Sequence, residues 1–154
     1  HNIGFMVVDA IHRRHAFGPW RTRHHGLMAE GMLAGRKARA LKPMTFMNDS
    51  GRSVAAAAHY YRIPSEAVFV LHDEIDLRAG KVRVKRGGGS AGHNGVRAID
   101  AHLGADYWRI RIGVGHPGER ERVQGHVLAD FAKADRGWLD TLLAAGEPSM
   151  CLSQ

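Results

Sequence analysis

The sequence predicts a single-domain α/β fold, a three-layer sandwich around a mixed, mostly parallel sheet. Helical and strand-like patterns alternate along most of the 154 residues, which favours helices packed on both faces of a sheet. One strand-like segment, AVFVL at 67–71, is continuously apolar, as in a strand buried on both faces. We find no internal repeat and no linker, and a chain of this length has room for one core.

The N-terminal half is expected to contain a helix, a hairpin and a second helix. Apolar residues at helical spacing mark residues 2–14, and a Gly-Pro pair ends that stretch. The segments 26–33 and 36–43 alternate moderately and lie two residues apart, which indicates a hairpin. Residues 45–51 read as a turn whose polar side chains can cap a helix at roughly 51–62.

The C-terminal half continues the alternation of strands and helices. We expect a buried strand at 67–73, a half-exposed strand at 81–87, a helix at 94–103, an alternating strand at 108–115 and an amphipathic helix at 133–145.

Charge indicates a polyanionic partner. The formal net charge is +7, and clustered Lys and Arg commonly bind phosphates. A protein that is basic only for solubility is the alternative. No apolar run approaches the length of a membrane span, and the first ten residues lack a basic leader. Cys151 is the single cysteine, which excludes an intrachain disulfide and fits a reducing cytoplasm.

An acidic segment, HDEID at 72–76, directly follows the buried strand. Catalytic groups favour the carboxyl ends of strands in α/β sheets. Asp73, Glu74 and Asp76 could bind a divalent metal, or one carboxylate could orient a histidine. A solvated acidic turn is the alternative.

Two further segments carry polar side chains at the expected start of a helix. The glycine-rich GGGSAGHNG at 87–95 resembles a phosphate loop but lacks the ending of a P-loop and the spacing of a dinucleotide fingerprint. Its His93 and Asn94 are placed to hold a ligand, unless the segment is a flexible surface loop. In TFMN at 45–48, Asn48 is by itself most simply a helix cap.

Basic residues alternate on two of the expected strands. Arg83 and Lys85 share one strand face, and Arg109 and Arg111 share another. If the strands are neighbours and the cations point outward, they form a patch suited to phosphates. A solvated sheet face is the alternative.

Taken together and in order, these segments closely resemble the bacterial peptidyl-tRNA hydrolases over roughly residues 1–145. The resemblance rests on HNIGF, LKPMTFMNDSG, LHDEIDLRAGKVRVKRGGGSAGHNGVRAI and WRIRIGVGHPG. It implies hydrolysis of the ester between a peptide and the 3′-terminal ribose of tRNA, in the cytoplasm, by a monomer that needs no metal or cofactor.

The resemblance also implies roles for single residues. His1 matches the general base, Asp73 the carboxylate that orients it, and Asn48 and Asn94 the asparagines that hold the peptide and the attacking water. A carboxylate on one imidazole nitrogen fixes the tautomer and stabilises the imidazolium that forms.

Four more positions match substrate-binding residues of the family. Phe46 matches a residue that lines the site for the terminal end of the tRNA. Lys85 and Arg111 match the basic residues that bind the tRNA phosphate, and His93 neighbours the site.

The sequence also departs from the family pattern. The chain opens at His1, without the family's first strand and its GLGNPG-type loop, and the last helix is cut short. We therefore expect an incomplete domain at 1–145, an unpatterned tail at 146–154, and an unpaired edge in the middle of the sheet. Two other functions stay open: an inactive RNA-binding relative on this scaffold, and a metal-dependent hydrolase using His72, Asp73 and Asp76.

Overall fold

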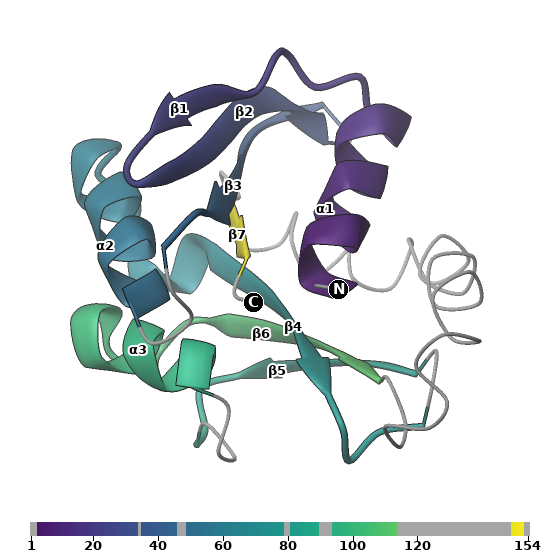
Figure 1. The fold of residues 1–154 in the computed structure, drawn as a ribbon, viewed down its shortest axis with the longest axis vertical. Coiled ribbons are helices and arrows are strands. Elements are labelled where there is room, and N and C mark those ends of the chain that lie inside the picture. Colours follow the sequence, from purple (N-terminus) through teal and green to yellow (C-terminus); the bar gives the residue numbers. More distant parts are fainter. Residues whose placement is uncertain are drawn as a thin grey trace.

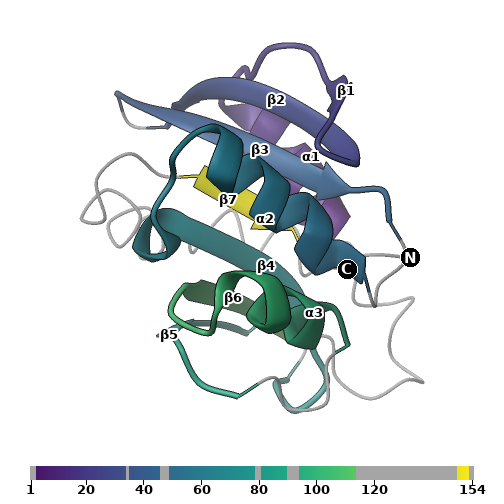
Figure 2. The same ribbon diagram turned by 90° about the vertical axis from the view of Figure 1, so that its left-hand side faces the viewer.

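A single mixed sheet with helices on both faces forms the molecule (Figures 1 and 2). The computed structural model describes residues 3–33, 35–45, 49–78, 81–89, 94–113 and 149–152. The helices are α1 (Ile3–Arg14), α2 (Ser50–Tyr60), α3 (Asn94–Leu103) and the short 3-10 helix η2 (Ser65–Ala67). The strands are β1 (Arg21–Arg23), β2 (Gly26–Leu33), β3 (Arg36–Pro43), β4 (Val68–Glu74), β5 (Val82–Arg86), β6 (Trp108–Gly113) and β7 (Ser149–Leu152).

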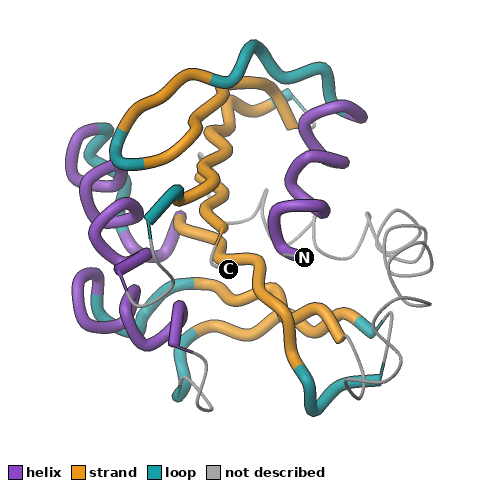
Figure 3. The backbone as a smooth tube through the Cα atoms, viewed as in Figure 1, coloured by secondary structure: helices purple, strands orange, loops and turns teal. Residues whose placement is uncertain are grey.

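The three layers follow the prediction. Helix α1 covers one face of the sheet, while α2 and α3 lie side by side on the other (Figures 1 and 3). The sheet order is β1-β2-β3-β7-β4-β6-β5. Strand β4 is therefore near the centre, and β1 and β5 form the two edges.

The predicted parallel majority is wrong for the described strands. Of their six pairings, β3 with β7, β7 with β4 and β4 with β6 are parallel, and the other three are antiparallel. The turns that join β1, β2 and β3 are too short for a crossover, so these strands can pair only antiparallel. Alternation of helix and strand in the sequence carries no information on the direction of β5, which runs antiparallel to β6.

The centre of the sheet contains a strand that the sequence pattern did not indicate. Residues 149–152 form β7, which pairs in parallel with β3 on one side and β4 on the other. We expected an unpaired edge in the middle of the sheet. In the structure the backbone groups of β3 and β4 meet those of β7 instead.

Two hydrophobic clusters confirm that β4 is buried on both faces. Phe69 and Leu71 pack with Val7, Val8 and Ile11 of α1. Val68 and Val70 alternate with them and pack on the other face with Val54, Ala57, Ala58 and Ile99 of α2 and α3. Each of the four β4 side chains is fully buried, so consecutive residues of this strand face different helices.

Most expected elements agree with the structure to within two residues. The hairpin segments 26–33 and 36–43 are β2 and β3 with identical bounds. Strand β1 was missed because its three residues, Arg-Thr-Arg, are all exposed and have no apolar pattern. The expected helix at 133–145 lies outside the described residues.

Candidate active site

Asp73 lies near the carboxyl end of the central strand β4 and faces the α1 side of the sheet. Side chains alternate along a strand, so Asp73 lies on the same face of β4 as Phe69 and Leu71, which pack under α1. It stands opposite Ile112 of β6. Its side chain is half-buried. The N-terminal end of α1 and the carboxyl end of β4 point to the same side of the molecule (Figures 1 and 2). His1, the predicted base, precedes α1 and lies outside the described residues.

The residues on either side of Asp73 face the opposite way. His72 and Glu74 lie on the same face of β4 as Val68 and Val70, which pack under α2 and α3. His72 and Glu74 are both buried. The Nδ1 atom of His72 lies 2.9 Å from the backbone oxygen of Asp73. Residues 72–74 are thus the end of strand β4, whereas Ile75 and Asp76 form an exposed turn. The solvated-turn alternative holds only for these last two residues.

Glu74 pairs with Arg111 across the two parallel strands. Arg111 donates from Nε at 3.0 Å and from Nη2 at 2.5 Å to the same carboxylate oxygen, Oε1. Burial alone would raise the pKa of Glu74, but the hydrogen bond and positive charge of Arg111 outweigh it and lower the pKa. Arg111 keeps 27% of its side chain exposed. The predicted phosphate-binding residue therefore reaches solvent while it is held by a carboxylate.

Lys85 lies on the edge strand β5, exposed, and close to the glycine-rich loop. A side-chain carbon added at Gly88 would lie 2.7 Å from its Nζ atom, and Gly88 has a φ of +97°, which favours glycine. Among the described residues, no ion pair involves Lys85. Its side chain is exposed, so within this part of the chain its ammonium group faces solvent.

Strands β5 and β6 are neighbours, as the basic patch requires, but Arg109 does not belong to that patch. Arg83 stands opposite Arg111, and Lys85 stands opposite Arg109. Arg109 is only 2% exposed, so the prediction of an outward cation is wrong for this residue. It was not foreseeable because strand alternation shows which residues share a face, and not which end of the face a helix covers.

Arg109 instead connects the glycine-rich loop to α3. It donates to the backbone oxygen of Gly89 at 2.5 Å and to Asp100 Oδ1 at 3.0 Å. Tyr107, fully buried, donates to the same Asp100 oxygen at 2.6 Å. Burial and this hydrogen bond raise the pKa of Tyr107. The loop and the helix that begins at Asn94 are thus anchored to β6.

Helices α2 and α3 approach each other closely where Gly51, near the start of α2, faces Ala98 in the middle of α3. A side-chain carbon added at Gly51 would lie 2.0 Å from the backbone oxygen of Ala98, so only glycine permits this distance. Asn94 is the first residue of α3 and is exposed. Asn48 precedes α2 but lies outside the described residues, as do Phe46 and His93.

A cavity adjoins the start of α2. A cavity of about 590 Å³ is lined by His25, Met44, Thr45, Asp49 and Arg52. Asp49 occupies the N-cap position of α2 without a side-chain cap hydrogen bond and instead pairs with Arg52 at 3.0 Å. The expected cap role is therefore not found at Asp49.

The proposed metal site at His72, Asp73 and Asp76 has no geometric support. His72 and Asp73 face opposite sides of the sheet, as their packing partners show. Across the described ranges, no three His, Cys, Asp or Glu side chains converge as metal ligands would. In the same part of the chain, no helix is long and apolar enough to cross a membrane.

These features define an α/β enzyme with a half-buried carboxylate at the carboxyl end of a central strand and basic residues on the neighbouring strands. Comparison with known proteins agrees and is more specific. The sequence profile of the family "Peptidyl-tRNA hydrolase" matches residues 1–152, and the chain belongs to this family.

Individual relatives support the assignment. A peptidyl-tRNA hydrolase of Granulibacter bethesdensis is 63% identical over 146 residues, which cover 94% of this chain and 75% of the relative. One of Acidiphilium cryptum is 58% identical, with 96% and 83% covered. The crystal structure of peptidyl-tRNA hydrolase from Acinetobacter baumannii superimposes with a TM-score of 0.72 at 41% identity, covering 91% of this chain and 72% of that one.

Proposed function

We propose that this protein hydrolyses the ester bond between a peptide and the 3′-terminal ribose of tRNA, which releases free tRNA for translation. The observation that carries the proposal is the position of Asp73, half-buried at the carboxyl end of β4 on the face that α1 covers. The match to the peptidyl-tRNA hydrolase family over residues 1–152 supports ester hydrolysis as the reaction in which this carboxylate takes part.

In the proposed mechanism His1 is the general base and water is the nucleophile. A free imidazole has a pKa of about 6.5 and is largely neutral near pH 7, so it can accept a proton from water. Asp73 accepts a hydrogen bond from the other ring nitrogen, which fixes the tautomer and stabilises the imidazolium as the proton is transferred. The hydroxide equivalent then attacks the ester carbonyl, the bond from the carbonyl carbon to the ribose oxygen breaks, and the ribose oxygen takes the proton held by the imidazolium.

Asn48 and Asn94 are proposed to position the reactants. An amide side chain both donates and accepts hydrogen bonds, which suits a water molecule and a peptide carbonyl. Asn94 is the first residue of α3 and is exposed, so its amide is accessible. The anchoring of α3 through Asp100 and Arg109 supports a fixed position for it.

The proposed binding residues for the tRNA end are Lys85, Arg111, Phe46 and His93. Lys85 is exposed, and Arg111 keeps part of its guanidinium in solvent, so both can contact phosphate. Phe46 is proposed to line the site of the terminal nucleotide, with His93 nearby. We further propose that the protein acts in the cytoplasm, as a monomer and without a cofactor. No observation favours the inactive RNA-binding alternative.

The substitution Asp73→Asn tests the proposal. The amide keeps the size of the side chain but cannot stabilise the imidazolium, so kcat on peptidyl-tRNA should fall about 10²–10⁴-fold while tRNA affinity is retained. Asp76→Asn is the matched control, because Asp76 is exposed three residues further along the chain. Equal rates in the two variants would remove Asp73 from the mechanism.

A further inference from the structure

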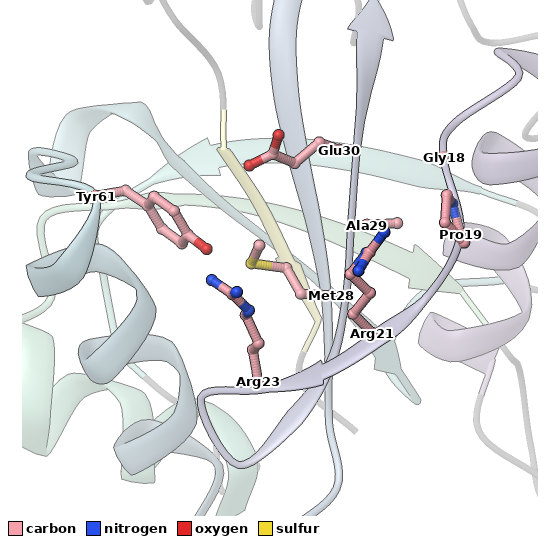
Figure 4. A pocket seen from close by; sticks show the side chains of 8 residues that line it. All are labelled: Gly18, Pro19, Arg21, Arg23, Met28, Ala29, Glu30 and Tyr61. Carbon is pink, nitrogen blue, oxygen red and sulfur yellow. The ribbon is translucent and has the colours of Figure 1, made fainter.

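A second pocket lies far from Asp73, between the β1–β2 ribbon and the C-terminal end of α2 (Figure 4). Its volume is about 320 Å³, at the lower end of the range of small-ligand pockets. Its lining comes from three stretches of the chain and includes Arg21, Arg23, Met28, Glu30 and Tyr61. Met28 is buried and supplies an apolar surface beside the charged groups.

The charge of this pocket is positive. Arg21 and Arg23 are exposed and two residues apart on β1, so they share one face of the strand. Within the described segments, neither takes part in an ion pair. The carboxylate of Glu30 is accompanied by Arg39 at 3.4 Å and Lys37 at 4.0 Å, so among the described residues it does not form an ion pair with either β1 arginine.

Aromatic rings border the pocket. The Arg39 guanidinium lies 4.2 Å from the centre of the Tyr61 ring, and Tyr60 packs edge-on against Tyr61 at 4.8 Å. Tyr60 is 64% exposed. Tyr60 itself does not line the pocket but packs on Tyr61, which does. Exposed rings near arginines are the combination with which proteins bind single-stranded nucleic acids, because bases stack on the ring and phosphates pair with the cations.

We propose that this pocket and Tyr60 bind an unpaired nucleotide of RNA, with its phosphate on Arg21 and Arg23 and its base against Tyr60. The inference rests on the proposed function in one respect: the RNA is taken to be that of the tRNA substrate. The pocket then gives the enzyme a second contact with the RNA, apart from the reacting ester.

A single ligand that contacts both this pocket and Lys85 must be large. Arg21 is on the edge strand β1 and Lys85 on the opposite edge strand β5, six strand intervals away. At about 4.8 Å per interval the two edges are roughly 29 Å apart. Arg21 lies on the same face of the sheet as Met28, which packs under α2. Arg111 lies on this face too, together with Val70. A folded RNA can reach both edges of this face, whereas a short ester cannot.

The double variant Arg21→Ala/Arg23→Ala tests the phosphate contact. With a fluorescein-labelled uridine oligomer as probe, fluorescence anisotropy should show roughly tenfold weaker binding. The slope of log affinity against log salt should fall by about 1.4, or about 0.7 for each phosphate. The matched control is Arg13→Ala/Arg36→Ala, which removes two exposed arginines outside the pocket. Equal losses in the two double variants would overturn the proposal.

A second pair of variants tests the stacking contact without changing charge. Tyr60→Ala should weaken oligomer binding roughly tenfold, whereas Tyr60→Phe should bind like the parent protein. Equal binding by both would overturn the stacking role, and equal competition by polyglutamate and by the oligomer would overturn RNA as the ligand. Hydrolysis of an N-blocked aminoacyl ester of adenosine, which lacks the RNA body, tests the proposed function separately. The Arg21 and Arg23 variants should hydrolyse it at the parental rate.

Discussion

Arg111 donates two hydrogen bonds to a single carboxylate oxygen of Glu74, on the strand beside it. Glu74 adjoins Asp73, but the two carboxylates face opposite sides of β4. Asp73 therefore faces the α1 side, and Glu74 holds a guanidinium on the α3 side. Adjacent acidic residues in this sequence thus have separate tasks because strand side chains alternate.

The pair makes stability depend on pH. Because Arg111 lowers the pKa of Glu74 in the folded state, the pair stabilises the fold fully above the unfolded pKa of about 4.5. This contribution is lost as the pH falls through the folded pKa. The free energy of unfolding of Glu74→Gln should therefore be smaller than that of the parent at pH 7. This difference in free energy should become smaller in acid. Urea denaturation over the pH range measures it, and a constant difference would contradict this origin.

Two basic residues should affect substrate binding rather than the chemical step. Lys85→Ala and Arg111→Ala are each expected to raise KM for peptidyl-tRNA and to leave kcat little changed, because their proposed partner is phosphate and not the reacting carbonyl. Each should also lower the salt slope of binding by about 0.7 to 0.9. Steady-state kinetics at several salt concentrations measure both effects. Lys81→Ala is the control, since Lys81 is exposed just before β5. An unchanged KM would mean that both residues are only solvated cations on the sheet and do not bind the substrate.

Features of the fold and site that depend on neighbouring residues in the sequence could be predicted, whereas features that depend on contacts between distant segments could not. The β2–β3 hairpin and the burial of β4 follow from patterns within a few residues, and both were predicted. The pairing of β7 with β3 and β4 joins segments more than 75 residues apart in sequence, so no local pattern contains it. Arg109 shows the same limit within the site. Its alternation with Arg111 was read correctly, but its burial depends on α3 and the loop at Gly89.

The close contact of α2 and α3 predicts that Gly51 tolerates no side chain. In Gly51→Ala the new carbon would lie 2.0 Å from the Ala98 backbone oxygen, so the helices must separate. Overpacking of this kind typically costs about 1–3 kcal/mol, and kcat should fall as well because Asn94 moves with α3. Thermal and urea denaturation measure the first effect. Gly89→Ala is the control, since an added carbon there has no neighbour within 4 Å. Equal stability of the two variants would contradict the packing argument.

The last prediction concerns the buried arginine that joins the glycine-rich loop to α3. Arg109→Ala removes the partner of Asp100 and of the Gly89 carbonyl, and loss of one member of a buried ion pair typically costs about 3–5 kcal/mol. Arg86→Ala is the control: Arg86 also makes a two-bond pair, with Asp106, but the pair is exposed, so the loss of stability should be much smaller. Urea denaturation of both variants and the parent measures the difference. Hydrolysis assays on the folded Arg109→Ala protein should show a lower kcat, because Asn94 and the loop lose their common anchor. Similar stability of the two variants would mean that Arg109 does not fix this part of the fold.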